Sequence, residues 1–118
     1  MSVLRIVANL ETKEPKLLAD FYDKIFDMKT VMDFGWITTS QSENTAPIQL
    51  STASEGGSGT VVPNLSIEVD NLEDVLKRAK DAGVKIEYGP VDEPWGVRRF
   101  YIRDPANNLL NILSHKDK

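Results

Sequence analysis

The chain has 118 residues, of which 41% are hydrophobic and 27% charged, the composition of one small globular domain or of two modules sharing a core. Its formal net charge of −4 argues against a general nucleic-acid binder, which needs a basic surface. The absence of cysteine excludes disulfides, thiolate metal sites and cysteine nucleophiles. No secretory signal and no apolar run near the ~18 residues of a membrane span are visible, so we expect a cytoplasmic protein without nucleic-acid or membrane partners.

The first half predicts a strand, a helix and three further strands. Residues 3–10 alternate, which is typical of a half-buried strand. Pro15 suits the first position of a helix that continues to about Asp27. The apolar residues of this helix recur at helical spacing: Leu17, Leu18, Phe21, Ile25 and Met28. The remaining pattern predicts strands over residues 29–33, 36–40 and 47–53, with a polar loop at 42–46.

The second half repeats this order after a stretch rich in glycine and serine. Residues 54–60 predict a linker between a first module at about 1–53 and a second module at about 61–118. A strand over 61–69 precedes a helix capped by Asp70 or Asn71 and ended by Gly83. The next strand is predicted at 84–88.

The segment from Glu93 to His115 predicts a β-hairpin with a tryptophan in the loop at its entrance. Pro94 and Gly96 mark a turn around Trp95. Residues 97–103 and 109–113 are rich in apolar, β-branched and aromatic residues, and the intervening Asp-Pro-Ala-Asn-Asn favours a turn.

The hairpin reads Pro-Trp-Gly-x-Arg-x-Phe-x-x-Arg-Asp-Pro-x-x-Asn-Leu-Leu, and it resembles the last hairpin of the glyoxalase/bleomycin-resistance/extradiol-dioxygenase superfamily. The Trp-Gly-x-Arg-x-Phe part is most similar to the bleomycin-resistance branch. The resemblance implies an α+β fold, in which two βαβββ modules form a curved mixed sheet around a cleft with the helices outside. It also implies a ligand on the concave face and a homodimer.

Enzymes of this superfamily hold a divalent metal through His, Gln or Glu side chains, and the matching positions of this chain carry neither a carboxylate nor an imidazole. The fifth-strand position is Asn64 and the eighth-strand position is Asn111. The first-strand position falls at 5–7 and the fourth-strand position at Gln49 or Ser51. Because neutral amides bind divalent ions weakly, we predict neither a metal, a cofactor nor catalytic residues. The single histidine, His115, is predicted to lie in a solvated tail just past the last strand.

Several residues are candidates for contact with a ligand. Trp95 offers a broad π-face for a planar or cationic ligand, although it also suits a plug between the modules. Glu93 either complements the charge of a ligand or is a solvated loop acid, and Arg98 either contacts a ligand or anchors the loop. By strand alternation, Glu68 shares a face with Asn64, while Phe100 lies on the opposite side of its strand from Arg99. The full set of candidate ligand-binding residues is Trp36, Asn64, Glu68, Glu93, Trp95, Arg98, Phe100 and Asn111.

These features favour a metal-independent protein that binds a small, planar or cationic, antibiotic-like molecule. The alternative is a metal-dependent enzyme of the same fold, such as a glyoxalase or a dioxygenase, and a third interpretation is a structural or regulatory domain with a vestigial cleft.

Overall fold

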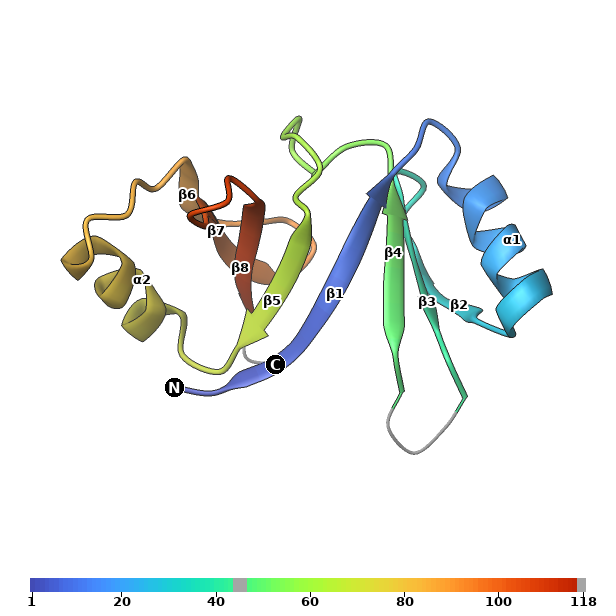
Figure 1. The fold of residues 1–118 in the computed structure, drawn as a ribbon, viewed down its shortest axis with the longest axis horizontal. Coiled ribbons are helices and arrows are strands. Elements are labelled where there is room, and N and C mark those ends of the chain that lie inside the picture. The colour runs from blue at the N-terminus through green and yellow to red at the C-terminus, as the bar shows by residue number, and fades with distance from the viewer. Residues whose placement is uncertain (44–46, 117–118) are drawn as a thin grey trace. The chain divides into compact units, whose positions relative to one another are not determined.

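The computed structural model describes residues 1–43 and 47–116. These residues form two α-helices and eight β-strands, in an α+β arrangement whose element order is βαβββ twice over (Figure 1). Residues 44–46 of the predicted loop and residues 117–118 of the predicted second module lie outside the described part. No helix among the described residues is long and apolar enough to cross a membrane.

The chain divides into two compact units, and the division does not follow the chain in two consecutive pieces. We call Val7–Val62 the first module, and Met1–Ile6 together with Pro63–Lys118 the second module. Strand β1 (Val3–Glu11) therefore gives its start to the second module and its end to the first. The linker predicted at 54–60 lies within the first module, close to its end.

The first module contains α1 (Pro15–Phe26) and three strands in addition to the end of β1. These strands are β2 (Lys29–Asp33), β3 (Ile37–Gln41) and β4 (Gln49–Ala53). The sheet has the order β2-β3-β4-β1, with β4 and β1 parallel and the other pairs antiparallel. Its interior is bonded by hydroxyl groups: Thr38 Oγ1 lies 2.7 Å from Thr52 Oγ1, which in turn donates to the carbonyl of Pro15 at 2.9 Å.

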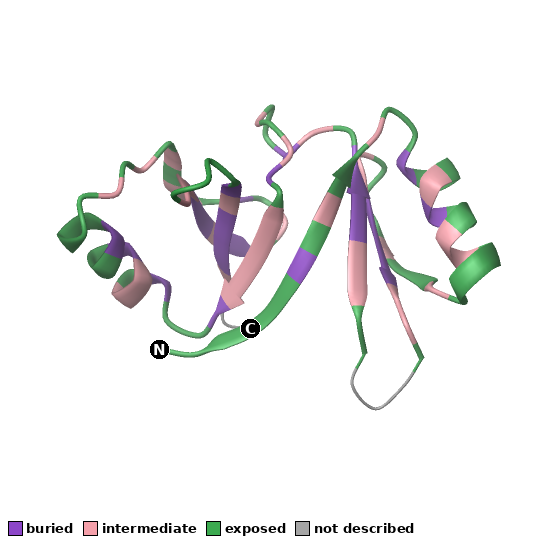
Figure 2. Cartoon of the chain, in the orientation of Figure 1, coloured by how far each residue is buried: buried purple, intermediate pink, exposed green. Residues whose placement is uncertain are grey.

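Helix α1 buries a different set of residues from the stripe predicted by its spacing. It packs against β2, β3 and β4 through Pro15 and Ala19, while Leu17, Phe21 and Ile25 are exposed. These three residues follow one another at intervals of four, so they form a continuous row on the outer side of the helix. Much of α1 is exposed (Figure 2), and its apolar residues extend beyond the part that the sheet covers.

The second module contains α2 (Leu72–Asp81) and a sheet in the order β5-β8-β7-β6. Its strands are β5 (Leu65–Val69), β6 (Tyr88–Asp92), β7 (Val97–Arg103) and β8 (Leu109–His115). Strands β5 and β8 are parallel and the other two pairs antiparallel. Phe100 is fully buried and Ile112 nearly so, and both pack with Val69, Leu72 and Leu76 in the core.

Helix α2 confirms the predicted capping signals. The Asn71 side chain accepts a hydrogen bond from the Asp74 amide at 3.2 Å, and Glu73 and Asp74 lie in the first turn, where acids favour the helix dipole. The strand predicted at 84–88 is wrong in position, because β6 begins at Tyr88 and includes Gly89 and Pro90. Proline is tolerated there because β6 is an edge strand, whose outward amides need no partner.

Candidate ligand-binding face

Two chemically different faces of the second module's sheet arise from strand alternation. Ile67, Phe100 and Ile112 point toward α2 in the core, so their sequence neighbours point to the opposite side. We call this opposite side the polar face. On this side β5 has Ser66 and Glu68, β7 has Val97, Arg99, Tyr101 and Arg103, and β8 has Leu109, Asn111, Leu113 and His115.

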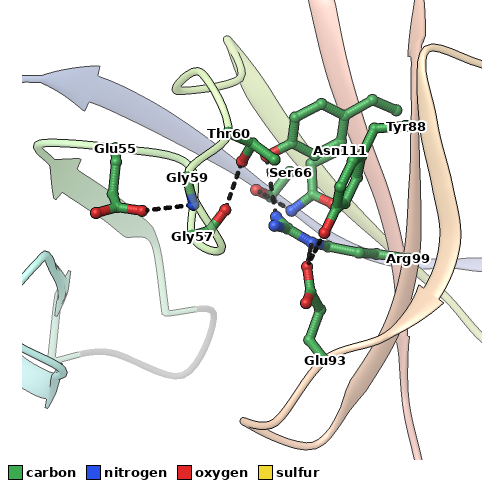
Figure 3. Close-up of polar contacts among 10 residues, drawn as sticks. Glu55, Gly57, Gly59, Thr60, Ser66, Tyr88, Glu93, Arg99 and Asn111 are labelled. Carbon is green, nitrogen blue, oxygen red and sulfur yellow. Dashed lines mark hydrogen bonds and ion pairs between the residues drawn. The ribbon is translucent and has the colours of Figure 1, made fainter.

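Arg99 is the most enclosed charge on the polar face, with only 2% of its surface exposed. Its Nε donates to Glu93 Oε2 at 2.7 Å (Figure 3). Its Nη1 donates to the Tyr101 hydroxyl at 3.0 Å. Its Cζ lies 5.3 Å, 5.1 Å and 4.9 Å from the ring centroids of Tyr88, Trp95 and Tyr101. Three aromatic rings and a carboxylate thus hold a flat cation, which offsets the cost of removing both charges from water.

Glu93 is part of this enclosed pair. Only 6% of its surface is exposed, and it accepts a second hydrogen bond from the Tyr88 hydroxyl at 2.9 Å. The interpretation of Glu93 as a solvated loop acid is therefore wrong. The tight turn over residues 93–97 folds it back, since the Glu93 amide donates to the Val97 carbonyl at 2.8 Å.

Asn111 supplies an acceptor that no described residue satisfies. Its Nδ2 donates to Ser66 Oγ at 3.1 Å, while its Oδ1 is buried and has no hydrogen-bond partner among the described residues (Figure 3). A buried carbonyl oxygen normally has a partner, in protein, water or ligand. The Asn111 Oδ1 is therefore available to accept a hydrogen bond from an N–H or O–H group of a bound molecule or water.

Glu68 joins three strands at the other side of the polar face. Its Oε1 accepts a hydrogen bond from Arg5 Nε on β1 at 2.6 Å, and its Oε2 lies 2.6 Å from His115 Nδ1 on β8. Burial raises the pKa of Glu68, but the hydrogen bonds from His115 and Arg5 outweigh it, so the pKa lies below its ordinary value. Glu68 is consequently an ionised carboxylate at neutral pH.

The structure gathers some of the predicted ligand-binding residues and separates others. Glu68, Glu93, Trp95 and Asn111 lie on or beside the polar face. Phe100 does not, because it faces the core under α2. Arg98 lies on the outer surface and pairs with Asp92 at 3.4 Å and Glu73 at 3.5 Å.

Asn64 and Trp36 have local roles in the structure. Asn64 is bound to the start of β8 by two hydrogen bonds of 2.8 Å. Its side-chain Oδ1 accepts from the Leu109 backbone amide, and its own backbone amide donates to the Leu109 carbonyl. Trp36 belongs to the first module, is half-buried before β3, and lies 6.4 Å from Phe34 between ring centroids.

The residues on or beside the polar face that were missed as candidates include Ser66, Tyr88, Arg99, Tyr101 and His115. Strand alternation already places Arg99 and Tyr101 on the opposite side of β7 from Phe100. Their burial was not predicted, because a charged residue on that side ordinarily indicates a solvent-exposed face. His115 was predicted past the last strand, which is wrong because β8 runs to His115. Its partner Glu68 is 47 positions away, and no local pattern indicates that pairing.

The positions that the resemblance assigns to metal ligands do not fit a divalent ion. The Asn64 Oδ1 is used by a backbone amide, and Asn111 is a neutral amide. In the first module, Ser51 Oγ bonds Thr39 Oγ1 at 2.7 Å and Gln49 Nε2 donates to Gln41 Oε1 at 2.6 Å. Among residues 1–43 and 47–116, no three His, Cys, Asp or Glu side chains gather. Hard divalent cations prefer anionic oxygens, which these positions lack.

The glycine-rich stretch of the first module forms a bonded turn. Glu55 Oε1 accepts from the Gly59 amide at 2.9 Å, and Thr60 Oγ1 donates to the Gly57 carbonyl at 2.7 Å (Figure 3). Gly57 and Gly59 have φ values of +89° and +76°, a region that glycine enters without strain. The glycines of this stretch are thus needed for the conformation of the turn, in addition to connecting the chain.

Comparison with known proteins places this architecture in a family. The family model described as "Glyoxalase/Bleomycin resistance protein/Dioxygenase superfamily" matches residues 7–112. No curated protein matches the chain in sequence.

Solved structures share the fold at low sequence identity. One described as an NAD-dependent benzaldehyde dehydrogenase from Legionella pneumophila is 17% identical, with a TM-score of 0.74, covering 95% of this chain and 100% of its own. A superfamily member from Vibrio splendidus 12B01 is 14% identical, with a TM-score of 0.66 and coverages of 96% and 99%. Methylmalonyl-CoA epimerase from Mycobacterium tuberculosis is 15% identical, with a TM-score of 0.64 and coverages of 98% and 88%. At these identities the likeness shows the fold alone.

Proposed function

Because the chain belongs to the glyoxalase/bleomycin resistance protein/dioxygenase superfamily, we propose that it is a metal-independent binding protein for a small, planar or cationic, antibiotic-like molecule. The observation that carries this proposal is the chemistry of the polar face, where uncharged amides stand at two expected metal-ligand positions beside a group of aromatic rings. A protein of this type binds by shape, stacking and hydrogen bonds. Tight binding alone removes a free toxin by mass action, so no chemical step is needed.

The aromatic group supports a planar or cationic ligand. Tyr88, Trp95 and Tyr101 already hold the flat guanidinium of Arg99, and Glu93 balances its charge. Trp95 is only half-buried, so part of its ring remains accessible for stacking. The unsatisfied Oδ1 of Asn111 adds an acceptor for a ligand that carries an N–H or O–H group.

The two tryptophans of the chain allow a direct test of this site. In Trp36→Phe, Trp95 is the only indole fluorophore; in Trp95→Phe, Trp36 is. Titration with metal-free bleomycin and with ethidium is expected to change the fluorescence of Trp36→Phe and to give binding in it as tight as in the unmodified chain. Trp95→Phe is expected to bind about two- to tenfold more weakly, since an aromatic stack contributes about 0.5–1.5 kcal/mol beyond its buried area and about 1.4 kcal/mol is a tenfold change in affinity. Equal affinity in both variants would contradict the proposal.

Metal analysis separates this proposal from the metal-dependent enzyme. The protein is purified without chelator, dialysed and analysed for zinc, iron, manganese and nickel. We expect far less than one metal ion per chain, and unchanged affinity for the probe after treatment with a chelator. One tightly held ion per chain would favour the enzyme instead.

We also propose that the protein is a homodimer, as the bleomycin-resistance branch of the family usually is. The row of exposed apolar residues on α1 supports an association, because contiguous apolar surface commonly marks protein contacts. Sedimentation equilibrium is expected to give twice the mass of 13.2 kDa. A monomer at all accessible concentrations would contradict the proposal.

A further inference from the structure

Arg5, Glu68 and His115 form a hydrogen-bonded group that the proposed ligand binding at Trp95 does not involve. His115 is the single histidine of the chain, and it stands at the end of β8 with 45% of its side chain exposed. Its Nδ1 lies 2.6 Å from Glu68 Oε2, whereas the other carboxylate oxygen of Glu68 accepts from Arg5 Nε at 2.6 Å. Both oxygens of Glu68 are thus fixed, and one of them holds the imidazole in place.

This hydrogen bond sets the tautomer of the imidazole. The Arg5 contact and the His115 contact keep the pKa of Glu68 below its ordinary value against the effect of burial, so the carboxylate is ionised and can only accept. His115 Nδ1 must then carry the proton, and the lone pair of the neutral ring is on Nε2. A carboxylate at Nδ1 also orients the ring and stabilises a positive charge that develops on it during a reaction at Nε2.

We propose that His115, oriented by Glu68, is a nucleophilic imidazole that accepts an acyl group from an activated ester or thioester and passes it to water. The lone pair of Nε2 attacks the carbonyl carbon, and the bond from that carbon to the alkoxide, phenolate or thiolate breaks, with the electron pair leaving on the departing atom. The product is an acyl-imidazolium whose Nδ1–H still donates to the Glu68 carboxylate. Water then attacks the acyl carbon, the Nε2–C bond breaks, and the free imidazole, the carboxylic acid and the protonated leaving group result.

Glu68 is a positioning residue in this scheme, and Arg5 positions Glu68 in turn. The carboxylate does not touch the acyl donor; it fixes the ring and offsets the charge of the acyl-imidazolium. Charge-assisted hydrogen bonds are roughly twice as strong as neutral ones, so an amide in place of the carboxylate should retain the geometry and lose much of the activation.

The test uses the full chain and two probes that need no natural ligand. Diethyl pyrocarbonate acylates imidazole nitrogen, and because His115 is the only histidine, the ultraviolet absorbance of the modified ring reports on this residue alone. Hydrolysis of para-nitrophenyl acetate reports on the complete cycle. The variants are Glu68→Gln, His115→Gln and, as a matched control on the surface of α2, Glu73→Gln. Circular dichroism and thermal unfolding show that each variant is folded.

The expected results are specific to an oriented imidazole. The unmodified chain and Glu73→Gln should react with diethyl pyrocarbonate faster than N-acetylhistidine does, and Glu68→Gln should be about tenfold slower, as one bond falls from charge-assisted to neutral strength. His115→Gln should lose both the absorbance signal and the ester hydrolysis above background. In Glu68→Gln, hydrolysis of para-nitrophenyl acetate should fall in kcat with KM unchanged, because the carboxylate does not touch the acyl donor.

Two results would overturn the inference: a modification rate in the unmodified chain no greater than that of N-acetylhistidine, or equal modification rates and kcat values in the unmodified chain and Glu68→Gln. Either result would leave the binding at Trp95 unaffected, because the fluorescence titration does not involve His115. The acyl-transfer activity and the binding function can therefore fail separately.

Discussion

The two modules have the same order of helices and strands, but their interiors are stabilised by different chemistry. In the first module, the buried part of the sheet is largely hydroxyl groups bonded in pairs, and α1 buries small residues while it exposes large ones. In the second, a large apolar core around Phe100 lies on one face of the sheet, and buried charges lie on the other. The same order of helices and strands thus accommodates two kinds of interior, and only the second module combines a large apolar core with an enclosed pair of charges.

The largest expected effect is the loss of the core of the second module. Phe100→Ala removes a fully buried ring from the core, so the free energy of unfolding should fall by about 3–5 kcal/mol. The matched change in the first module is Phe34→Ala, a residue outside α1 that is 47% exposed, with an expected effect within about 0.5 kcal/mol. Urea unfolding measures both. Equal losses would show that an exposed aromatic residue of the first module contributes as much stability as the core of the second, and would contradict the difference between the modules.

A smaller effect is expected from the hydroxyl pairs of the first module. Thr52→Val leaves both the Thr38 hydroxyl and the Pro15 carbonyl without their partner, which should cost about 1–3 kcal/mol. Thr38→Val should cost less, because Thr52 still donates to Pro15. The same unfolding experiment measures the pair, and a larger loss in Thr38→Val would contradict this assignment of the bonds.

The N-caps of α1 and α2 also differ, and the expected effect on stability is smaller. Asn71→Ala removes the side-chain cap of α2 and should cost about 1 kcal/mol. Glu14 occupies the matching position before α1 and makes no cap bond through its side chain, so Glu14→Ala should have almost no effect. The difference between the two variants in thermal unfolding checks this; equal effects would mean that the caps do not distinguish the modules.

The smallest expected effect is on how the free energy of unfolding depends on acidic pH, to which Glu68 of the second module contributes. Its pKa is lower in the folded chain than its ordinary value of 4.5, so its contribution to stability is present above that value and is lost as the pH falls through the lower folded pKa. Glu68→Gln should therefore flatten the fall in the free energy of unfolding below about pH 4.5, while leaving the slope near neutrality unchanged. Urea unfolding at several pH values measures both chains, and identical acid slopes would contradict the role of Glu68.

Most of the fold could be predicted because its signals are local. Helix α2 has its cap, its first-turn acids and Gly83 within a dozen positions, and the hairpin of β7 and β8 is marked by its turn residues. The start of β6 was displaced because an edge strand tolerates Pro90, which the pattern interprets as an end. The apolar row of α1 satisfied the helical period without being buried, since periodicity does not show which side a sheet covers.

The polar face was harder to predict because its contacts join distant or unusual residues. The resemblance brought attention to Trp95 and Asn111, and alternation placed Glu68 on the correct side of its strand. Arg99 was not expected at the centre because a charged residue in a strand ordinarily indicates solvent, and only its pairing with Glu93 and three rings permits its burial. The link from Glu68 to His115 depends on the parallel register of β5 and β8, which sequence spacing does not reveal.

The division of β1 between the modules has a consequence for dissecting the protein. The second module takes Met1–Ile6, and within it the Ser2 amide donates to Asp70 Oδ1 at 2.8 Å while Arg5 binds Glu68. A protease cut in the glycine-rich turn would therefore yield a carboxy-terminal fragment that lacks a segment of its own scaffold. That fragment should regain order when a synthetic peptide of the first residues is supplied, so the shortest autonomous piece of this polypeptide is discontinuous in sequence.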